Sequence, residues 1–474
     1  MKIFLENRHK IHHAQIFTGL HYANNLRVVA LEVPNEVLNH DLHRVEENAT
    51  YHENIANVEH LFQRLNAGGT VLDDEELAYS MIKAYWPEIE QPIEELVVKR
   101  MPASRLAMLG TRAALSKKKP DKLPGSLTVS AMRNIAQKKD QVIRDFFLPA
   151  NPPTSSQNNS IEPILKQVDM WLGENYTDNI GLPPVLLSAM ARGAPDVYLL
   201  LMWLADQFLL NPNNQYKDLR KRLVGLTTAL HWFGVDKRVA AATLYEKLNK
   251  KSNLFCDDTF EGILNNIYEL EGGKIGLYQI PTPEELDGLI ILPTDEKTLK
   301  EWHWWKLARD IQNQELPHYQ ILQRIKQEKV LLLYAQRGHL KTAYPNYDPA
   351  RQDLWEQHNR PWDYDHILPS KIIYYQQNIS SGVREWANSI ANLRAWPMEE
   401  NRSDQDESPS SKLNDPIKLT GSFINQGELD GFDTGYKDIT NSNNALIFVN
   451  NSKKRLLRIY KEWYETLDIG FLTK

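Results

Sequence analysis

The sequence lacks three features that would fix its class at once: cysteine pairs, a long apolar run and an excess of basic residues. Cys256 is the only cysteine in 474 residues, which excludes a disulfide framework and a structural zinc ion held by paired Cys-x-x-Cys motifs. No apolar stretch approaches the roughly 18 residues that span a bilayer. The N-terminal MKIFLENRHK also lacks the apolar segment of a signal peptide. These absences predict a cytoplasmic chain with no membrane partner.

The net charge is −6, with 55 lysines and arginines against 61 aspartates and glutamates. This excludes a uniformly basic protein that coats nucleic acid. It leaves room for a local basic patch, because the field near a binding groove decides DNA association. The densest basic run is KKKPDK, Lys117 to Lys122, which is predicted to be a basic loop. The hydrophobic fraction of 42% and the charged fraction of 24% are those of an ordinary globular protein.

Apolar residues recur at helical spacing through most of the middle of the chain. Leu77, Met81 and Trp86 fall on one side of a predicted helix, and Asp74 or the aspartate before it caps the first turn. Between 183 and 210, two strongly apolar runs are interrupted by glycine and proline. The second run is too short and too interrupted to cross a membrane, so it is predicted to be a buried core helix.

The two ends of the chain differ from this helical middle. Residues 1–95 mix helical stretches with LRVVALEVP at 26–34, whose β-branched residues and terminal proline are typical of a strand. The segment from Ser452 predicts a basic amphipathic helix that docks on the helical scaffold, with a position beside bound DNA as the alternative. Its apolar face consists of Leu456, Ile459, Tyr460 and Trp463.

The residues that indicate chemistry begin in WDYDHILPS, from Trp362 to Ser370. His366 can take a proton from water, since imidazole titrates near neutral pH. Asp365 and Asn401 offer hard oxygen atoms, which suit Mg²⁺ or Mn²⁺. Asn392 can fix the histidine through its side-chain carbonyl. A regular strand would point the side chains of Asp365 and His366 to opposite faces, so a strand end or bulge is expected here.

This pattern resembles the HNH (ββα-metal) nuclease finger, in which two strands are followed by a helix that carries the last ligand. DYDHILPS matches the D-x-D-H-I-x-P core of that finger. The resemblance implies Asp365 and Asn401 as ligands of one divalent ion, His366 as general base and Asn392 as its orienter. Asp363 is implied as an alternative ligand or as an acid behind the ligands. The long step from His366 to Asn392 implies an insertion, for which KIIYYQQNISSGVREW is the candidate.

A second resemblance covers more of the chain. FQRLNAGGTVLDDEELAYSMIKAYWPE, YAQRG and DYDHILPS are similar to segments of the GmrSD-type restriction endonuclease family, which joins a ParB-like N-terminal domain to a C-terminal HNH domain. The family's Asp-Gly-Gln-Gln-Arg motif, tied to nucleotide hydrolysis, does not occur here. The resemblance therefore implies a shortened member, or a separate chain that carries the sensor and NTPase half. It also implies that this chain alone does not use a nucleotide.

Together these observations predict a mainly α fold: a helical scaffold with a remnant α+β N-terminal region and a C-terminal ββα-metal (HNH) finger. The expected domains are 1–95, 96–340, 341–450 and a terminal helix at 451–474. The expected function is metal-dependent DNA cleavage in restriction or phage defence. Arg337 is expected to contact phosphate or to pair with an acid, and Lys412 to contact phosphate or the ligands from behind. Two alternatives remain: a non-catalytic DNA- or partner-binding subunit of a split restriction system, and an RNA-cutting toxin.

Overall fold

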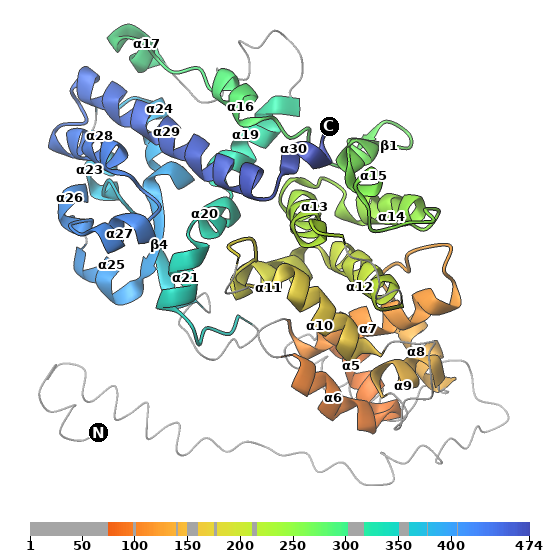
Figure 1. The fold of residues 1–474 in the computed structure, drawn as a ribbon. Coiled ribbons are helices and arrows are strands. Elements are labelled where there is room, and N and C mark those ends of the chain that lie inside the picture. Colours follow the sequence, from red (N-terminus) through yellow and green to blue (C-terminus); the bar gives the residue numbers. More distant parts are fainter. Residues whose placement is uncertain are drawn as a thin grey trace, which may run out of the picture. The chain divides into compact units, whose positions relative to one another are not determined.

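The computed structural model describes residues 74–97, 101–138, 141–148, 160–174, 178–210, 216–301, 317–349, 360–376, 378–404 and 406–474. The α+β elements expected in the first 73 residues, and the NAGGT turn among them, lie outside this range. Residues Asp73–Lys474 form one compact unit, so the boundaries expected after residues 95, 340 and 450 all fall inside it. Helices predominate in this unit, as predicted (Figure 1).

The first described helices form a bundle in which α5 packs against α7 and α8, and α7 packs against α9. The helix expected from Asp74 is confirmed and buries Met81, while Trp86, also buried, follows its last residue and caps η3. The basic run at 117–122 begins on α7, where Lys117 pairs with Asp206 at 3.0 Å. The elements are α5 (Asp74–Tyr85), η3 (Pro87–Ile89), α6 (Glu90–Leu96), α7 (Ala103–Lys118), α8 (Val129–Gln137) and α9 (Gln141–Phe147).

The next five helices bury the most apolar part of the sequence. The run at 183–210 forms α11 and α12, which meet at a bend of 107°. Most of α12 is buried, as predicted for a core helix. Among the described residues, no single helix is long and apolar enough to cross a membrane. The elements are α10 (Ile161–Leu172), α11 (Pro184–Gly193), α12 (Pro195–Leu210), α13 (Leu219–Phe233) and α14 (Lys237–Leu248).

Shorter elements connect this helical region to the C-terminal part of the chain. They include a two-stranded antiparallel hairpin, whose turn uses Gly272 and Gly273 at positive φ. The elements are α15 (Asp257–Phe260), η4 (Ile263–Ile267), β1 (Glu269–Leu270), β2 (Lys274–Ile275), α16 (Pro283–Leu289), α17 (Glu296–Glu301), α19 (Pro317–Gln327), α20 (Lys329–Ala335) and α21 (Arg337–Ala343).

The C-terminal part holds the second sheet. Strands β3 and β4 pair antiparallel, with Asp365 opposite Arg394 and His366 opposite Leu393. The predicted insertion between them folds as α23 and α24. The polar segment that contains Lys412 forms the short helices α26 and α27. The elements are β3 (Trp362–His366), α23 (Ser370–Tyr374), α24 (Ser381–Ala387), η5 (Ile390–Asn392), β4 (Leu393–Pro397), α25 (Met398–Asp404), α26 (Pro409–Lys412), α27 (Pro416–Gly421), α28 (Gln426–Lys437), α29 (Ser442–Thr466) and α30 (Ile469–Leu472).

Helix α29 joins the region of the second sheet to the helical region (Figure 1). It begins ten residues earlier than the helix expected from Ser452, because Asn441 caps its first turn. The ring of Trp463 lies 5.1 Å from that of Phe233 and 5.7 Å from that of Trp232, both on α13. All four residues of its predicted apolar face are buried, so the predicted docking on the scaffold is confirmed.

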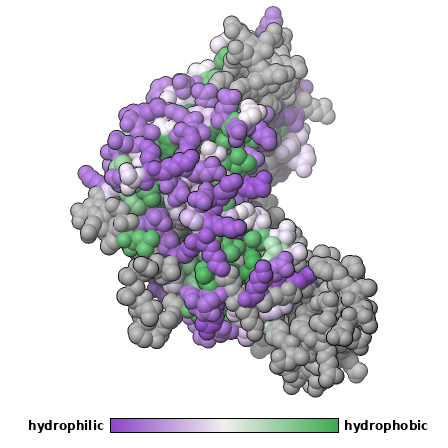
Figure 2. Space-filling model, turned by 90° about the vertical axis from the view of Figure 1, so that its right-hand side faces the viewer, coloured by the Kyte–Doolittle hydropathy of each residue, from purple (hydrophilic) through white to green (hydrophobic). Residues whose placement is uncertain are grey.

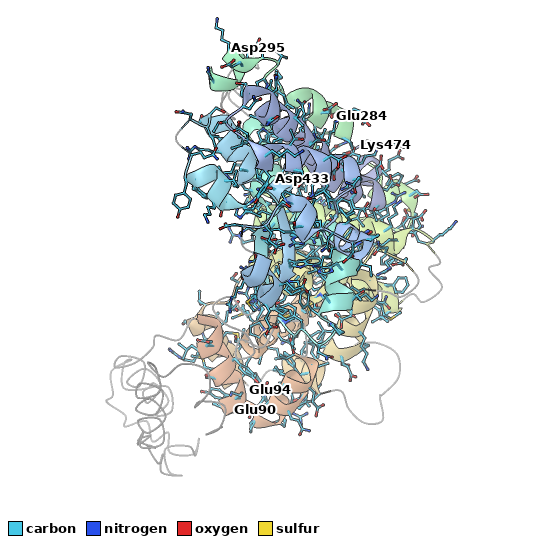
Figure 3. The ribbon with its side chains drawn as sticks, turned by 90° about the vertical axis from the view of Figure 1, so that its left-hand side faces the viewer. Glu90, Glu94, Glu284, Asp295, Asp433 and Lys474 are labelled. Carbon is cyan, nitrogen blue, oxygen red and sulfur yellow. The ribbon has the colours of Figure 1, made fainter. Side chains whose placement is uncertain are left out.

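The face seen in Figure 2 is mostly hydrophilic, with apolar side chains in small separate groups. Figure 3 labels the acidic residues Glu284 and Asp295 toward one end of the ribbon and Glu90 and Glu94 toward the other.

One buried histidine of the core should make stability depend on pH. Burial lowers the pKa of His231 to about 3, and Nδ1 of its ring has no hydrogen-bond partner among the residues that the structure describes. The contribution of neutral His231 to the unfolding free energy is fully present above the pKa of about 6.5 that histidine has in the unfolded chain. It is lost as the pH falls towards the pKa in the folded protein, because only the unfolded state then binds the proton. As the pH falls from 7 to 5, we expect the unfolding free energy of His231→Gln to decrease less steeply than that of the wild type. The difference in slope should be up to about 1.4 kcal/mol per pH unit. Urea unfolding at pH 7, 6 and 5 measures this difference, and parallel curves would contradict it.

Candidate functional site

The expected site residues lie on β3, on β4 and on the helix that directly follows β4. Alternation along β3 places Asp363 and Asp365 on one face and Tyr364 and His366 on the other. Helix α25 packs against both strands and carries Asn401. The register continues to His366 without a bulge, so the bulge that the sequence allowed is absent from this pairing.

Asp365 lies in a buried cluster with two cations. Arg394 donates from Nε to Oδ2 at 2.7 Å, and Lys412 donates from Nζ to Oδ1 at 3.0 Å. The side chains are 4%, 0% and 1% exposed for Asp365, Arg394 and Lys412. Lys412 also donates to the backbone carbonyl of His366 at 3.0 Å. Both oxygens of the expected ligand therefore already have a cationic partner, and Lys412 contacts this ligand directly.

Asp363 and Asn401 lie together beside this cluster. Asn401 donates from Nδ2 to Oδ2 of Asp363 at 3.4 Å, which is a long hydrogen bond. Within the described part of the chain, Oδ1 of Asp363 and Oδ1 of Asn401 have no hydrogen-bond partner. The structure thus brings a carboxylate oxygen and an amide oxygen to one place, on the face that also carries Asp365.

His366 has a neighbour that was not singled out from the sequence. The side chain of Asn388 acts on its imidazole and favours the protonated ring. Oδ1 of Asn388 also accepts a hydrogen bond from the hydroxyl of Tyr374 at 3.0 Å. Burial has the larger effect and lowers the pKa of His366 below its usual value. The ring is therefore neutral at pH 7 and can accept a proton.

Asn392 does not hold the imidazole, which corrects the role expected for it. Its side chain is fully buried and bonds to backbone groups: Oδ1 accepts from Leu368 N at 2.8 Å, and Nδ2 donates to Leu368 O and Ala387 O. It thereby fixes the loop that follows His366. The NSIAN motif contains both asparagines, and Asn388, at the end of α24, is the one that reaches the ring.

Arg337 contacts residues away from the cluster of Asp363, Asp365 and Asn401. It is 3% exposed, pairs with Glu462 of α29 at 2.7 Å and donates to the backbone carbonyl of Asn179. Of its two expected roles, the ion pair with an acid is the one that this geometry provides. The neighbouring residue Gln336 bonds to β4 of the site. The side-chain amide of Gln336 accepts from Ala395 N at 2.8 Å and donates to Gly421 O at 2.6 Å. Gln336 therefore completes the outer edge of β4.

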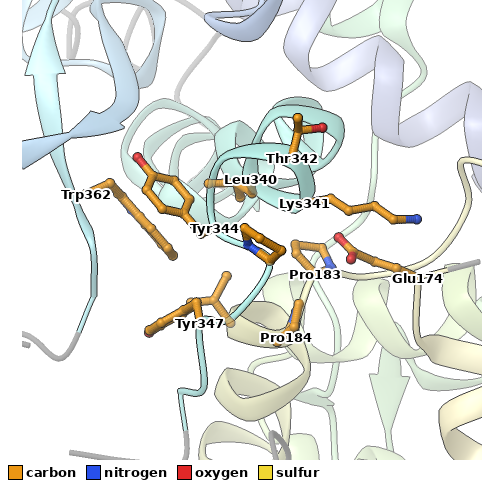
Figure 4. A pocket seen from close by; sticks show the side chains of 11 residues that line it. Glu174, Pro183, Pro184, Leu340, Lys341, Thr342, Tyr344, Tyr347 and Trp362 are labelled. Atoms are coloured by element: carbon orange, nitrogen blue, oxygen red, sulfur yellow. The ribbon is translucent and has the colours of Figure 1, made fainter. Parts of the chain in front are cut away.

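A pocket of about 510 Å³ opens next to the start of β3 (Figure 4). The ring of Trp362 lies on one side of it, and Pro183 and Pro184 lie on the other. The ring of Tyr347 is 5.2 Å from that of Trp362, and the ring of Tyr344 is 5.3 Å from it. Aromatic rings therefore line the pocket close to the expected site. Trp362 and Tyr347 are buried, and Tyr344 is partly exposed.

Within the described residues, no group of three or more histidines, cysteines, aspartates or glutamates is arranged to hold a metal ion. The expected ligand set differs from such a group, because one of its oxygens belongs to an asparagine, Asn401. A comparison of the chain with family models, with curated proteins and with solved structures gives no match.

Proposed function

We propose that this chain is a divalent-metal-dependent DNA endonuclease with an HNH-type finger, which acts in restriction of foreign DNA such as that of phages. One observation carries the proposal: β3, β4 and α25 place Asp363, Asp365 and Asn401 on one face. His366 is the last residue of β3, and its side chain points to the other face of the strand. Carboxylate and amide oxygens next to a histidine are the groups that metal-assisted phosphodiester hydrolysis requires.

The donor types in this cluster fit Mg²⁺ or Mn²⁺. Hard oxygens come from Asp363, Asp365 and Asn401, and Oδ1 of Asp363 and of Asn401 is not hydrogen-bonded within the described residues. A bound ion would neutralise charge on the phosphate and on the departing oxygen. The amine of Lys412 bonds to Oδ1 of Asp365, the oxygen that would bind the ion. Asp365 can therefore join these ligands once this amine moves away.

The chain's own residues supply the proton transfer. His366 is neutral because burial lowers its pKa, and it takes a proton from the water that attacks the phosphate. The side chain of Asn388 acts on the same ring and favours its protonated form, so it supports uptake of the proton. Asn392 holds the backbone of Leu368 and so fixes the loop after His366.

Both oxygens of Asp365 accept hydrogen bonds from cations, and this favours a second function. With Arg394 and Lys412 on its two oxygens, the cluster can be a stable structural element that binds no ion. The chain would then be a non-catalytic subunit that binds DNA or a partner chain.

Both functions would place the chain in the cytoplasm, with DNA as one partner and a separate sensor chain as another. Cleavage of RNA would use the same chemistry at the cluster. Paired assays on DNA and RNA of one sequence separate these substrates, and selective cutting of RNA would replace the DNA proposal.

Binding of Mn²⁺, followed by electron paramagnetic resonance, separates the enzyme from the non-catalytic subunit. We expect Asn401→Ala to weaken binding. Lys412→Met should strengthen it about ten-fold or more, because one competing positive charge is removed from Oδ1 of Asp365. Lys437→Met is the matched control, since this exposed lysine lies at the end of α28. No Mn²⁺ binding in the wild type or in Lys412→Met would favour the non-catalytic subunit.

A further inference from the structure

Two cations share one aromatic ring on the face of β3 that carries His366. Nζ of Lys329 lies 4.4 Å from the ring centroid of Tyr364, and Cζ of Arg360 lies 4.7 Å from it. Tyr364 and His366 are two residues apart on the strand, so their Cα atoms are about 7 Å apart on the same face. The positive charges therefore lie next to the proposed general base.

Neither cation makes an ion pair with a carboxylate in the described part of the chain. Lys329 is exposed, and the guanidinium of Arg360 donates from Nε to the backbone carbonyl of Trp362 at 3.0 Å. Partial desolvation of its amine, and after it the charge of Arg360, lowers the pKa of Lys329. Two neighbouring like charges without a carboxylate repel each other, and a bound anion would relieve that repulsion.

Arg360 connects this cation pair to the pocket. Its charge acts on the hydroxyl of Tyr347 as well as on that of Tyr364. The ring of Tyr347 stands nearly perpendicular to that of Trp362, at 78°, and both rings line the pocket of about 510 Å³. A volume of this size takes a small ligand, and aromatic walls favour a planar ring. Trp362, Tyr364 and His366 follow one another on the same face of β3.

We propose that one strand of DNA lies along this face, with a phosphate between Lys329 and Arg360 and an unstacked base in the pocket beside Trp362. This inference rests on the proposed function, and it assigns the substrate a position on the face that carries His366. The phosphate supplies the missing negative charge, and the base packs against the partly exposed ring of Tyr344, which lines the pocket. The strand then reaches His366, about 13 Å from Trp362 along β3.

The test is binding of a fluorescent single-stranded DNA oligonucleotide by anisotropy, at several salt concentrations and in EDTA so that no cutting occurs. Each phosphate contact with a single strand contributes about 0.7 to the slope of log K against log salt. We expect the double variant Lys329→Ala/Arg360→Ala to lower that slope by about 1.4. The matched control Lys250→Ala/Lys251→Ala removes two exposed lysines after α14 and should leave the slope unchanged.

Thr342→Trp tests the pocket separately, because this exposed residue lines it and an indole there would fill the space. We expect weaker binding with an unchanged salt slope, since no charge is lost. Equal slopes in the two double variants, or full affinity of Thr342→Trp, would overturn the inference. Binding as predicted by a protein that never cuts DNA would instead contradict the proposed function and leave this binding face in place.

Discussion

Replacement of His366 by alanine should lower the rate of DNA cleavage by about 10²–10⁴-fold, the usual contribution of a positioned general base. The loss follows from the neutral imidazole, whose pKa is lowered by burial, and from its position at the end of β3. Binding of Mn²⁺ should persist, because none of the proposed ligand oxygens belongs to His366. Initial rates of plasmid conversion at saturating metal measure the effect.

His231→Gln is the matched control for this experiment. It also replaces a buried histidine of lowered pKa, but it lies on α13, away from β3 and β4. Its cleavage rate should equal that of the wild type. Cutting at the wild-type rate by His366→Ala would remove His366 from the role of base.

Replacement of Asp365 by alanine should lower the unfolding free energy by about 3–5 kcal/mol, and it should abolish both Mn²⁺ binding and cutting. Arg394 and Lys412 would remain buried without their carboxylate, at 0% and 1% exposure. Uncompensated buried charge is among the largest single sources of destabilisation in proteins. Urea unfolding of the two proteins at pH 7 gives the difference.

The triple variant Asp365→Leu/Arg394→Met/Lys412→Met tests whether the lost unfolding free energy comes from unpaired charge or from lost packing. Replacing a whole buried ion cluster by apolar side chains is often neutral or stabilising. We therefore expect the triple variant to recover most of the stability that Asp365→Ala loses, while it stays inactive. If Asp365→Ala unfolds at the wild-type urea concentration, the buried cluster contributes little and the account of this carboxylate is wrong.

The order of elements around the site could be predicted because local chemistry determines it. The β-branched and aromatic residues of WDYDHI favour a strand, and Pro369 ends it and becomes the cap of α23. The helical pattern of the last segment also predicted which face of α29 is buried. These features depend on residues close together in the chain.

The partners of the site residues could not be predicted, because residues distant in the sequence provide them. Lys412 reaches Asp365 only because α26 folds back towards β3, although its polar segment predicts a flexible loop. Asn388 and Asn392 are only four residues apart, and the end of α24 decides which of them meets the imidazole. Arg455, within the predicted basic amphipathic helix, is fully buried and donates to the backbone carbonyl of Leu393 at the start of β4.

The central claim is that this chain cuts DNA with a divalent ion at the β3–β4–α25 cluster. The most direct measurement incubates supercoiled plasmid, unmodified and phage-modified, with the wild-type protein in Mg²⁺ or Mn²⁺ and again in EDTA. The account predicts nicked or linear DNA with either ion and intact DNA in EDTA. Intact DNA under every condition, or cutting that persists in EDTA, would contradict it.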